Sequence, residues 1–416
     1  MSRVVDVKGN INITQRTDIG GNTITQDVSA TVGNYTITYP GTQGNDKAVL
    51  VNDGTGALSW KPSTKGDLRS LLFNPFATSV DTTTLITGLP PFLGRYSPPS
   101  LAPNGKLYYP PNLSNDNSNK SVLIIDTHTN TADGTTIPLP TADRWWTSTL
   151  ATNGKIYSSP WDTNQSILII DPETNTIDTS SLTIGVAVTG GTWTDSQLAP
   201  NGKIYCCPAN NDQVLIIDPI NNTVDTSTIS GLSGTNKWEG MCLAPNGKLY
   251  CAPWDSTSVL IIDPSDDTVD VVSITGITGR YWYMTLAPNG KMYSVGYNTG
   301  TILIIDPITN TADTSTITFS QVTGGNVGMV LAPDGKIYSI PSSSTYVLII
   351  DPETDTIDTT TISGLSSDSS KWTTGILSLE GKIYCAPFKS TYDNFLIIPT
   401  GDATIPIERC TSSYFK

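Results

Sequence analysis

The sequence predicts an all-β protein built around a seven-bladed β-propeller. Three observations support this prediction. One phrase, Leu-Ala-Pro-Asn-Gly-Lys-x-Tyr, recurs with variants seven times at intervals of 43 to 49 residues. A second phrase, Leu-Ile-Ile-Asp, follows each of the first six copies. Charged residues make up only 14% of the 416, whereas there are 35 Gly and 28 Pro, a composition of short strands and tight turns. A period of this size is typical of a propeller or a solenoid.

Each repeat is predicted to hold four strands. The inner strand ends in Leu-Ala, as in residues 146–150. Asn-Gly follows and predicts a two-residue hairpin turn with positive φ at both positions. The second strand is Lys-x-Tyr-x-x, as in 203–207, and the third is Val-Leu-Ile-Ile, as in 122–125, which is apolar on both faces like a strand between two blades. Asp-Pro-x-x-Asn then predicts a turn, and the Thr-rich fourth strand suits an outer edge.

The two ends of the repeat region predict a closed ring. The seventh copy has its third strand at 394–398, but no Asp-Thr-Thr-Thr strand follows it. Such a strand stands before the first copy instead, where Ser79–Ile86 resembles Ile357–Ile362. We therefore expect the N-terminal strand to complete the last blade. The predicted organisation is a propeller over 78–410, preceded by a linker at 65–77 and followed by a C-terminal tail at 411–416.

These motifs carry a family resemblance. Asn-Gly-Lys-x-Tyr, followed by Ser-Val-Leu-Ile-Ile-Asp-Pro-x-Thr-Asn-Thr, resembles the YVTN-type propeller repeats of surface proteins over about residues 78–400. The resemblance implies the fold and leaves the function open, because propellers carry many activities.

Residues 1–64 lack the repeat and are predicted to form a β-rich anchor or assembly segment. A segment of this length that is mostly polar buries only a small hydrophobic core by itself. Self-association or docking on a larger body is therefore favoured. The passage Tyr35–Gly44 with Ala48–Trp60 resembles a junction in tail-fibre and other virion structural proteins of phages and large DNA viruses. The resemblance implies partners among other virion proteins, bound through residues 1–64, and a possible homotrimer.

One repeat position pairs a basic residue with an aromatic residue. Five residues before the Leu of Leu-Ala stands a large aromatic residue in six of the seven copies, and a basic residue precedes it in five copies. Aromatic rings stack on sugars and cations pair with carboxylate or sulfate, so a ring of such pairs at the channel mouth predicts a glycan site. The candidate ligand-binding residues are Arg95, Tyr96, Arg144, Trp145, Trp193, Lys237, Trp238, Arg280, Tyr281, Lys371 and Trp372.

Two other interpretations of this ring stay open. An aromatic residue at a fixed repeat position can pack between blades with the neighbouring cation stacked on it. An assembly contact is the third interpretation. Trp161, Trp254 and Phe388, which follow the second strand, are expected to cover the blade edges or to line one face.

Composition excludes several classes of site. A net charge of −14 disfavours nucleic-acid binding. The single histidine, His128, rules out a site built on several histidines, and the six cysteines contain no C-x-x-C. The Asp residues after Ile-Ile are explained by turns, so no metal is predicted, and no cofactor is implied. Glu239 and Glu380 stand isolated in the sequence, no carboxylate pair can be located, and we expect no enzymatic activity. No segment is long enough to insert into a membrane as a helix.

The function predicted from these observations is that of a virion structural protein, assembled in the host cytoplasm. Its propeller would attach to a host receptor or surface glycan, or decorate the fibre, tail or capsid. A non-viral surface lectin or adhesion propeller is the alternative, and a polysaccharide-active enzyme is the third possibility.

Overall fold

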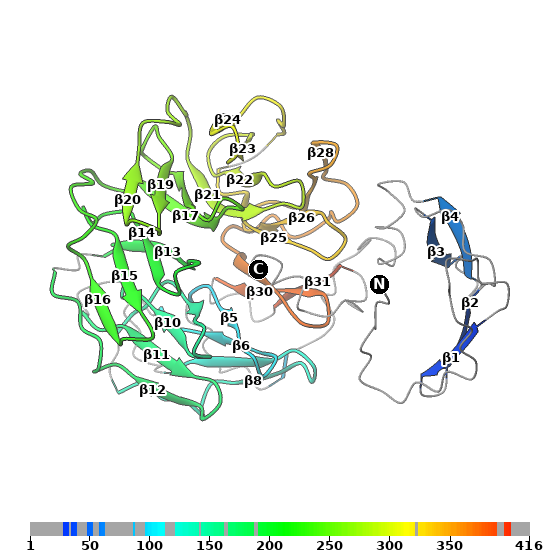
Figure 1. Cartoon of the computed structure of the whole chain (residues 1–416), viewed down its shortest axis with the longest axis horizontal. Helices are drawn as coiled ribbons and strands as arrows, with labels where there is room; N and C mark the ends of the chain where they lie inside the picture. Colours follow the sequence, from blue (N-terminus) through cyan, green and yellow to red (C-terminus); the bar gives the residue numbers. More distant parts are fainter. Residues whose placement is uncertain are drawn as a thin grey trace, which may run out of the picture. The chain divides into compact units, whose positions relative to one another are not determined.

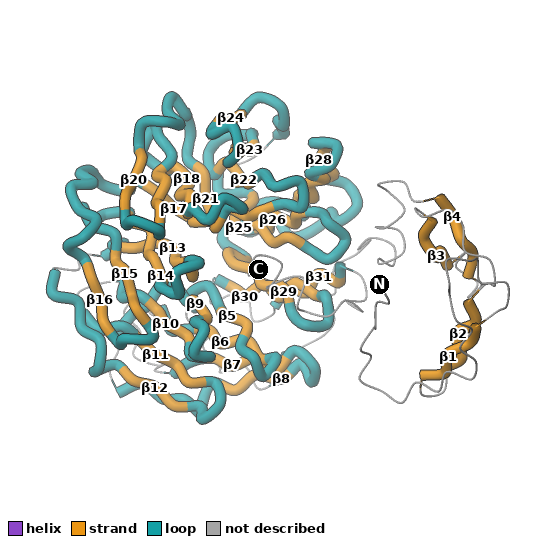
Figure 2. The backbone as a smooth tube through the Cα atoms, viewed as in Figure 1, coloured by secondary structure: helices purple, strands orange, loops and turns teal. Residues whose placement is uncertain are grey.

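The computed structural model of the 416-residue chain divides into two compact units, residues 1–75 and 76–416. The structure describes residues 28–32, 35–39, 48–52, 58–62, 86–87, 96–112, 121–140, 143–161, 165–186, 190–320, 323–388 and 395–400. All described regular elements are strands, as Figure 2 shows. No helix long and apolar enough to cross a membrane occurs among these residues. The predicted boundaries at 64, 77 and 410 lie outside them and remain predictions.

The N-terminal unit contains two antiparallel strand pairs. The first pairs β1 (Val28–Val32) with β2 (Tyr35–Tyr39), and the second pairs β3 (Ala48–Asn52) with β4 (Leu58–Pro62). The first pair falls where the sequence alternates between apolar and polar residues, whereas β3 is an apolar run up to Asn52.

The second unit is a ring of seven antiparallel blades (Figure 1), which confirms the predicted fold class. Blade 1 holds β5 (Ser100–Leu101), β6 (Lys106–Tyr109), β7 (Leu123–Asp126) and β8 (Thr131–Asp133). Blade 2 holds β9 (Thr149–Leu150), β10 (Ile156–Ser158), β11 (Leu168–Asp171) and β12 (Thr176–Asp178). Blade 3 holds β13 (Trp193–Leu198), β14 (Ile204–Pro208), β15 (Leu215–Asp218) and β16 (Thr223–Asp225).

The remaining blades follow the same order from the inner to the outer strand. Blade 4 holds β17 (Trp238–Leu243), β18 (Leu249–Pro253), β19 (Leu260–Asp263) and β20 (Thr268–Asp270). Blade 5 holds β21 (Tyr281–Leu286), β22 (Met292–Gly296), β23 (Ile302–Asp306) and β24 (Thr311–Asp313). Blade 6 holds β25 (Asn326–Leu331), β26 (Ile337–Pro341), β27 (Leu348–Asp351) and β28 (Thr356–Asp358). Blade 7 is described over β29 (Trp372–Leu377), β30 (Lys382–Pro387) and β31 (Leu396–Pro399).

The turn between the first two strands differs from the predicted hairpin. In blade 3 the Gly202 amide donates to Ala199 O at 3.0 Å, and the Ala199 amide donates to Lys203 O at 2.8 Å. The loop is therefore Pro-Asn-Gly, with positive φ only at Gly202. The prediction of positive φ at the Asn as well is wrong, because the loop has three residues and needs the left-handed conformation only at its last one.

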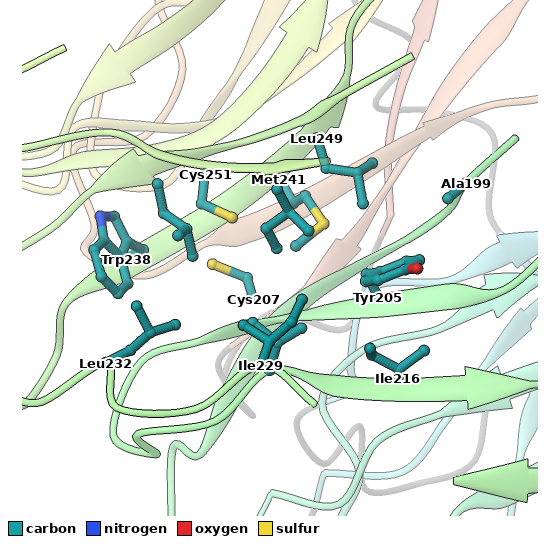
Figure 3. Close-up of a cluster of buried hydrophobic side chains, with 13 residues drawn as sticks. Ala199, Tyr205, Cys207, Ile216, Ile229, Leu232, Trp238, Met241, Leu249 and Cys251 are labelled. Carbon is teal, nitrogen blue, oxygen red and sulfur yellow. The ribbon is translucent and has the colours of Figure 1, made fainter. Parts of the chain in front are cut away.

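The turns and third strands follow the prediction. Asp171 accepts hydrogen bonds from the amides of Glu173 and Thr174, which is the Asx turn expected after Ile-Ile-Asp. The third strands are buried on both faces up to that Asp. Their apolar side chains fill the spaces between neighbouring blades. Figure 3 shows one such cluster, to which Cys207 and Ile216 come from blade 3 and Trp238, Met241 and Cys251 come from blade 4.

A repeated hydrogen-bonded contact, here called the latch, joins blades 1 to 6 in order. Asn201 of blade 3 donates to the Tyr205 hydroxyl at 2.9 Å and to Pro264 O of blade 4 at 2.8 Å. The Tyr205 hydroxyl in turn donates to Asp267 of blade 4. Five Asn residues make the equivalent contact with a Pro carbonyl, namely Asn104, Asn153, Asn201, Asn246 and Asn289.

The ring closes between blade 7 and blade 1 through a variant of this latch. Glu380 replaces the Asn and Thr127 replaces the Pro, and the Thr127 hydroxyl donates to Glu380 at 2.8 Å. The Tyr384 hydroxyl donates to Asn130 Oδ1 at 2.8 Å. Of the predicted closing strand only Ile86 is described. It packs between blades 7 and 1, whereas Thr87 pairs with Thr131 of blade 1 in parallel.

Candidate functional site

The aromatic residues of the predicted basic–aromatic ring are buried between the blades. The side chains of Tyr96, Trp145, Trp193, Trp238, Tyr281 and Trp372 are all at most 6% exposed. The indole Nε1 of Trp145, Trp193 and Trp238 donates to the carbonyls of Ser166, Gln213 and Ser258, where the third strand of the same blade begins. The fixed repeat position therefore supplies packing and one interior hydrogen bond.

The cations beside these rings are engaged inside the protein. The Lys237 ammonium is 2.9 Å from both Ala209 O and Asn211 O, and the Lys371 ammonium is 3.0 Å from Ser344 O and Asp368 O. Arg144 donates to Asn112 Oδ1 at 3.3 Å, and Arg280 pairs with Asp255 at 2.6 Å. Arg95 lies outside the described residues. A ligand role for this ring stays a prediction, and packing accounts for its geometry.

The residues next along the inner strands point to a different site. Each inner strand of blades 3, 4 and 5 contains a β-bulge, located between Trp193 and Ser196, between Trp238 and Met241, and between Trp282 and Thr285. A bulge places two residues opposite one and redirects their side chains. The side chains of Asp195, Glu239, Trp282 and Tyr283 stand at or beside these bulges, and all four residues keep part of their surface exposed.

Asp195 and Glu239, here called the carboxyl pair, come from neighbouring blades. Asp195 reaches across to blade 4, where its Oδ2 accepts from the Met241 amide at 2.7 Å, and its Oδ1 accepts from the Ser196 amide at 2.8 Å. Glu239 lies two residues before Met241. Its Oε2 is buried without a hydrogen-bond partner.

Both carboxyls bind a proton more tightly than the carboxyl of an ordinary Asp or Glu does. Burial raises the pKa of Asp195 to about 7, against the lowering effect of its two amide donors. Burial and then the charge of Asp195 raise the pKa of Glu239 to about 8, against a hydrogen bond with Thr194. The charge of Asp195 opposes the ionisation of Glu239, so Glu239 is the member of the pair that holds its proton more tightly.

Tyr283 closes against this pair in a strained conformation. Its φ is 51°, a left-handed value that is rare for an aromatic residue. Gly240, the residue after Glu239, makes this possible. A Cβ on Gly240 would lie 2.5 Å from Tyr283 Cα. Burial and the charges of Asp195 and Glu239 raise the pKa of Tyr283 well above its ordinary value, and its hydroxyl is buried without a partner. Strain of this kind is found preferentially at functional sites.

Four partly exposed rings form an aromatic cluster beside the carboxyl pair: Trp254, Trp282, Tyr283 and Tyr297. Trp282 stacks on Tyr283 with centroids 5.7 Å apart and planes 6° apart. Trp254 lies 5.5 Å from Trp282 and 4.8 Å from Tyr297, and the Arg280 guanidinium covers Trp254 at 5.3 Å. The Trp282 Nε1 is buried and has no hydrogen-bond partner.

Sequence reasoning misses this site and treats Glu239 as isolated, which is wrong. Asp195 and Glu239 lie 44 positions apart, and only the ring brings them together. A signal is nevertheless present. When the seven inner segments are aligned on the Leu of Leu-Ala, these are the only two acidic residues in the five positions before that Leu. The described residues contain no group of three or more His, Cys, Asp or Glu that could hold a metal ion.

Comparisons with known proteins show the fold. No protein-family model and no curated protein matches the sequence. Among solved structures, a streptogramin B lyase is similar with 11% identity and a TM-score of 0.60, over 76% of this chain and 95% of that one. A virginiamycin B lyase from Staphylococcus aureus is similar with 12% identity and a TM-score of 0.58, over 76% and 96%. The extracellular domain of a putative one-component system from B. thetaiotaomicron is similar with 12% identity and a TM-score of 0.57, over 91% and 53%.

These similarities correct one prediction. The expectation that the chain is not an enzyme is contradicted, because its propeller is similar to streptogramin B lyases, which are enzymes. The expectation depends on the absence of a carboxylate pair, and the structure contains one. At 11 to 12% identity the likeness shows the fold alone and assigns no substrate to this chain.

Proposed function

We propose that this protein is a surface-displayed β-propeller that binds a carbohydrate at the aromatic cluster and the carboxyl pair. The observation that supports this most directly is the set of four partly exposed rings around Trp282, directly beside two carboxyls. Aromatic faces stack on the C–H surfaces of sugars, and carboxyl oxygens accept hydrogen bonds from sugar hydroxyls.

The charges in the site favour a neutral, hydroxyl-rich glycan over an anionic one. Arg280, the cation that covers Trp254 of the aromatic cluster, is paired with Asp255 at 2.6 Å. Lys237 and Lys371 are at most 4% exposed and donate to backbone carbonyls. Within the part of the chain that the structure describes, an anionic sugar would therefore meet two carboxyls and cations that are already paired.

For the setting of this site we propose display on a virus particle. The resemblance of residues 35–60 to virion structural proteins supports it. Residues 1–64 would bind other virion proteins, with the chain as a homotrimer, and the glycan would lie on the host surface. Many copies on one particle would add avidity to weak single sites. A non-viral surface propeller is the second setting, which the extracellular domain from B. thetaiotaomicron among the similar structures favours.

A glycan array probed with the purified full chain tests the proposed function. We expect binding to neutral oligosaccharides, reduced at least tenfold in Trp254→Ala because one face of the cluster is lost. Trp161→Ala is the matched control, since Trp161 occupies the same repeat position in blade 2 and packs on Trp146 instead. Failure of the wild-type chain to bind any glycan, or equal loss in both variants, would overturn the proposal.

A further inference from the structure

We propose that the carboxyl pair hydrolyses the bound glycan, with Glu239 as the general acid and Asp195 as the general base. The inference rests on the proposed carbohydrate site and adds a reaction to it. It comes from the contrast between the surroundings of the two carboxyls, because both oxygens of Asp195 accept from backbone amides whereas Glu239 Oε2 has no partner.

Asp195 is the member of the pair whose two oxygens are both hydrogen-bonded for the charged form. Both of its oxygens accept hydrogen bonds from backbone amides, Met241 in blade 4 at 2.7 Å and Ser196 in its own strand at 2.8 Å. Backbone amides can donate to the charged form and cannot accept a proton from the neutral form. Asp195 therefore keeps the negative charge when the pair holds one proton.

Glu239 is the member that keeps the proton. Its Oε2 has no partner in a buried position, and the charge of Asp195 opposes its ionisation. The neighbouring titratable groups are Tyr283, Cys206, Cys207 and Cys242, and burial first and then the charge of Asp195 raise the pKa of each. None of them stabilises an anion at Glu239. Two carboxyls whose surroundings separate their roles in this way provide an acid and a base.

Two further buried polar groups favour a bound ligand at this place. The Trp282 Nε1 and the Tyr283 hydroxyl lack partners in the described residues, although buried donors are almost always hydrogen-bonded. Tyr283 is held by the left-handed turn against Gly240, so its hydroxyl has a defined position. Sugar hydroxyls would satisfy both donors once a chain lies on the aromatic cluster.

The reaction is a hydrolysis that balances with water alone. The bond between the anomeric carbon and the glycosidic oxygen breaks, and that oxygen takes the proton of Glu239. The oxygen of a water molecule bonds to the anomeric carbon, and Asp195 takes one of its protons. Proton transfer from Asp195 back to Glu239 restores the pair for the next turnover.

Leaving-group chemistry tests the two roles. The full chain is incubated with the oligosaccharides that it binds on the array and with 4-nitrophenyl and 2,4-dinitrophenyl glycosides of both anomeric forms. We expect Glu239→Gln to lose at least 100-fold in kcat on oligosaccharides and much less on dinitrophenyl glycosides, which leave without a proton. Asp195→Asn should lose activity on both. Glu173→Gln is the control, because Glu173 is an exposed turn residue.

The outcomes separate the two proposals. Binding on the array without hydrolysis of any bound or chromogenic glycoside overturns the catalytic role and leaves the carbohydrate site standing. Hydrolysis of chromogenic glycosides without array binding overturns the proposed attachment function instead. Loss of activity in Glu239→Gln that is equal for good and poor leaving groups overturns the assignment of Glu239 as the acid. Circular dichroism and glycan binding of each variant show whether it is folded.

Discussion

At the scale of single residues, the same residue type plays opposite electrostatic roles in different parts of the ring. Asp178 at an outer turn is hydrogen-bonded by Ser180 and Ser181, and these donors lower its pKa to about 2. Asp195 on an inner strand has two amide donors as well, but burial outweighs them and raises its pKa to about 7. Desolvation therefore sets the direction of the pKa shift for Asp195 on the inner strand, and hydrogen bonding sets it for Asp178 at the outer turn.

This contrast predicts the pH dependence of stability. An unfolded Asp or Glu ionises near pH 4, whereas Asp195 and Glu239 ionise at about 7 and 8 when folded. The folded state therefore binds more protons between pH 4 and pH 8, so the free energy of unfolding falls as pH rises through that window. In urea unfolding, the free energy of unfolding of the wild-type chain should fall by roughly 1–3 kcal/mol between pH 5 and pH 8. The fall should be smaller in Glu239→Gln.

Asp178→Asn is the control for this measurement. The pKa of Asp178 is lowered, so its contribution to stability is present above pH 4 and is lost as pH falls through about 2. Its replacement should leave the slope between pH 5 and pH 8 unchanged. If the free energy of unfolding falls with pH equally in the wild-type chain and in Glu239→Gln, the assignment of raised pKa values to the pair is contradicted.

At the scale of elements, the inner strands of blades 3 to 7 all contain a bulge, so the residues placed at the bulges make the interface of blades 4 and 5 different. In β17 and β21 the backbones of Gly240 and Tyr283 approach so closely that no side chain fits at Gly240. The same bulge lets Tyr283 and Trp282 stack instead of pointing to opposite faces of β21, as successive strand residues do. The residues that blades 3, 4 and 5 place at their bulges therefore form the site.

Gly240→Ala should be more destabilising than an ordinary glycine substitution. The new Cβ would meet Tyr283 Cα at 2.5 Å, and φ at this position is 76°. We expect a loss of more than about 2 kcal/mol in the free energy of unfolding, because the backbone of Tyr283 must move. Gly276→Ala is the matched control, because Gly276 has a φ of 78° and open space around it. It should lower the free energy of unfolding by about 1 kcal/mol. Equal losses in chemical denaturation would show that Tyr283 adapts freely.

At the scale of the whole molecule, ring closure depends on a latch in which donor and acceptor are exchanged. The Asn of the ordinary latch donates to a Pro carbonyl, as Asn201 does to Pro264. Between blades 7 and 1, Glu380 accepts from the Thr127 hydroxyl instead. Both substitutions occur at the same interface, so each compensates for the other.

A double-mutant cycle tests this compensation. Thr127→Pro removes the hydroxyl donor and should cost about 1.5–3 kcal/mol, since the acceptor is a carboxylate. Adding Glu380→Asn to that variant recreates the ordinary latch and should recover at least half of the loss. The midpoints of chemical unfolding of the four proteins give the coupling free energy. Strictly additive losses would mean that the two residues do not act as a latch.

The features that depend on neighbours along the chain can be predicted from the amino-acid sequence. The seven repeats, the Asx turns such as that of Asp171 and the doubly buried third strands follow from local hydrogen bonding and hydrophobic periodicity. The shape of the Pro-Asn-Gly loop is the local feature that differs, because its length depends on strand pairing.

Only the tertiary structure decided the candidate site. Asp195, Glu239 and Tyr283 belong to three different blades, and none carries a local motif. Their meeting depends on the circular order of the blades and on one extra residue in each inner strand. The aromatic residues at the fixed repeat position illustrate the reverse case. Their constant spacing reflects packing between blades, as Trp145 and Trp193 show. A repeat reports what every blade needs to fold, whereas a site arises where single blades depart from it.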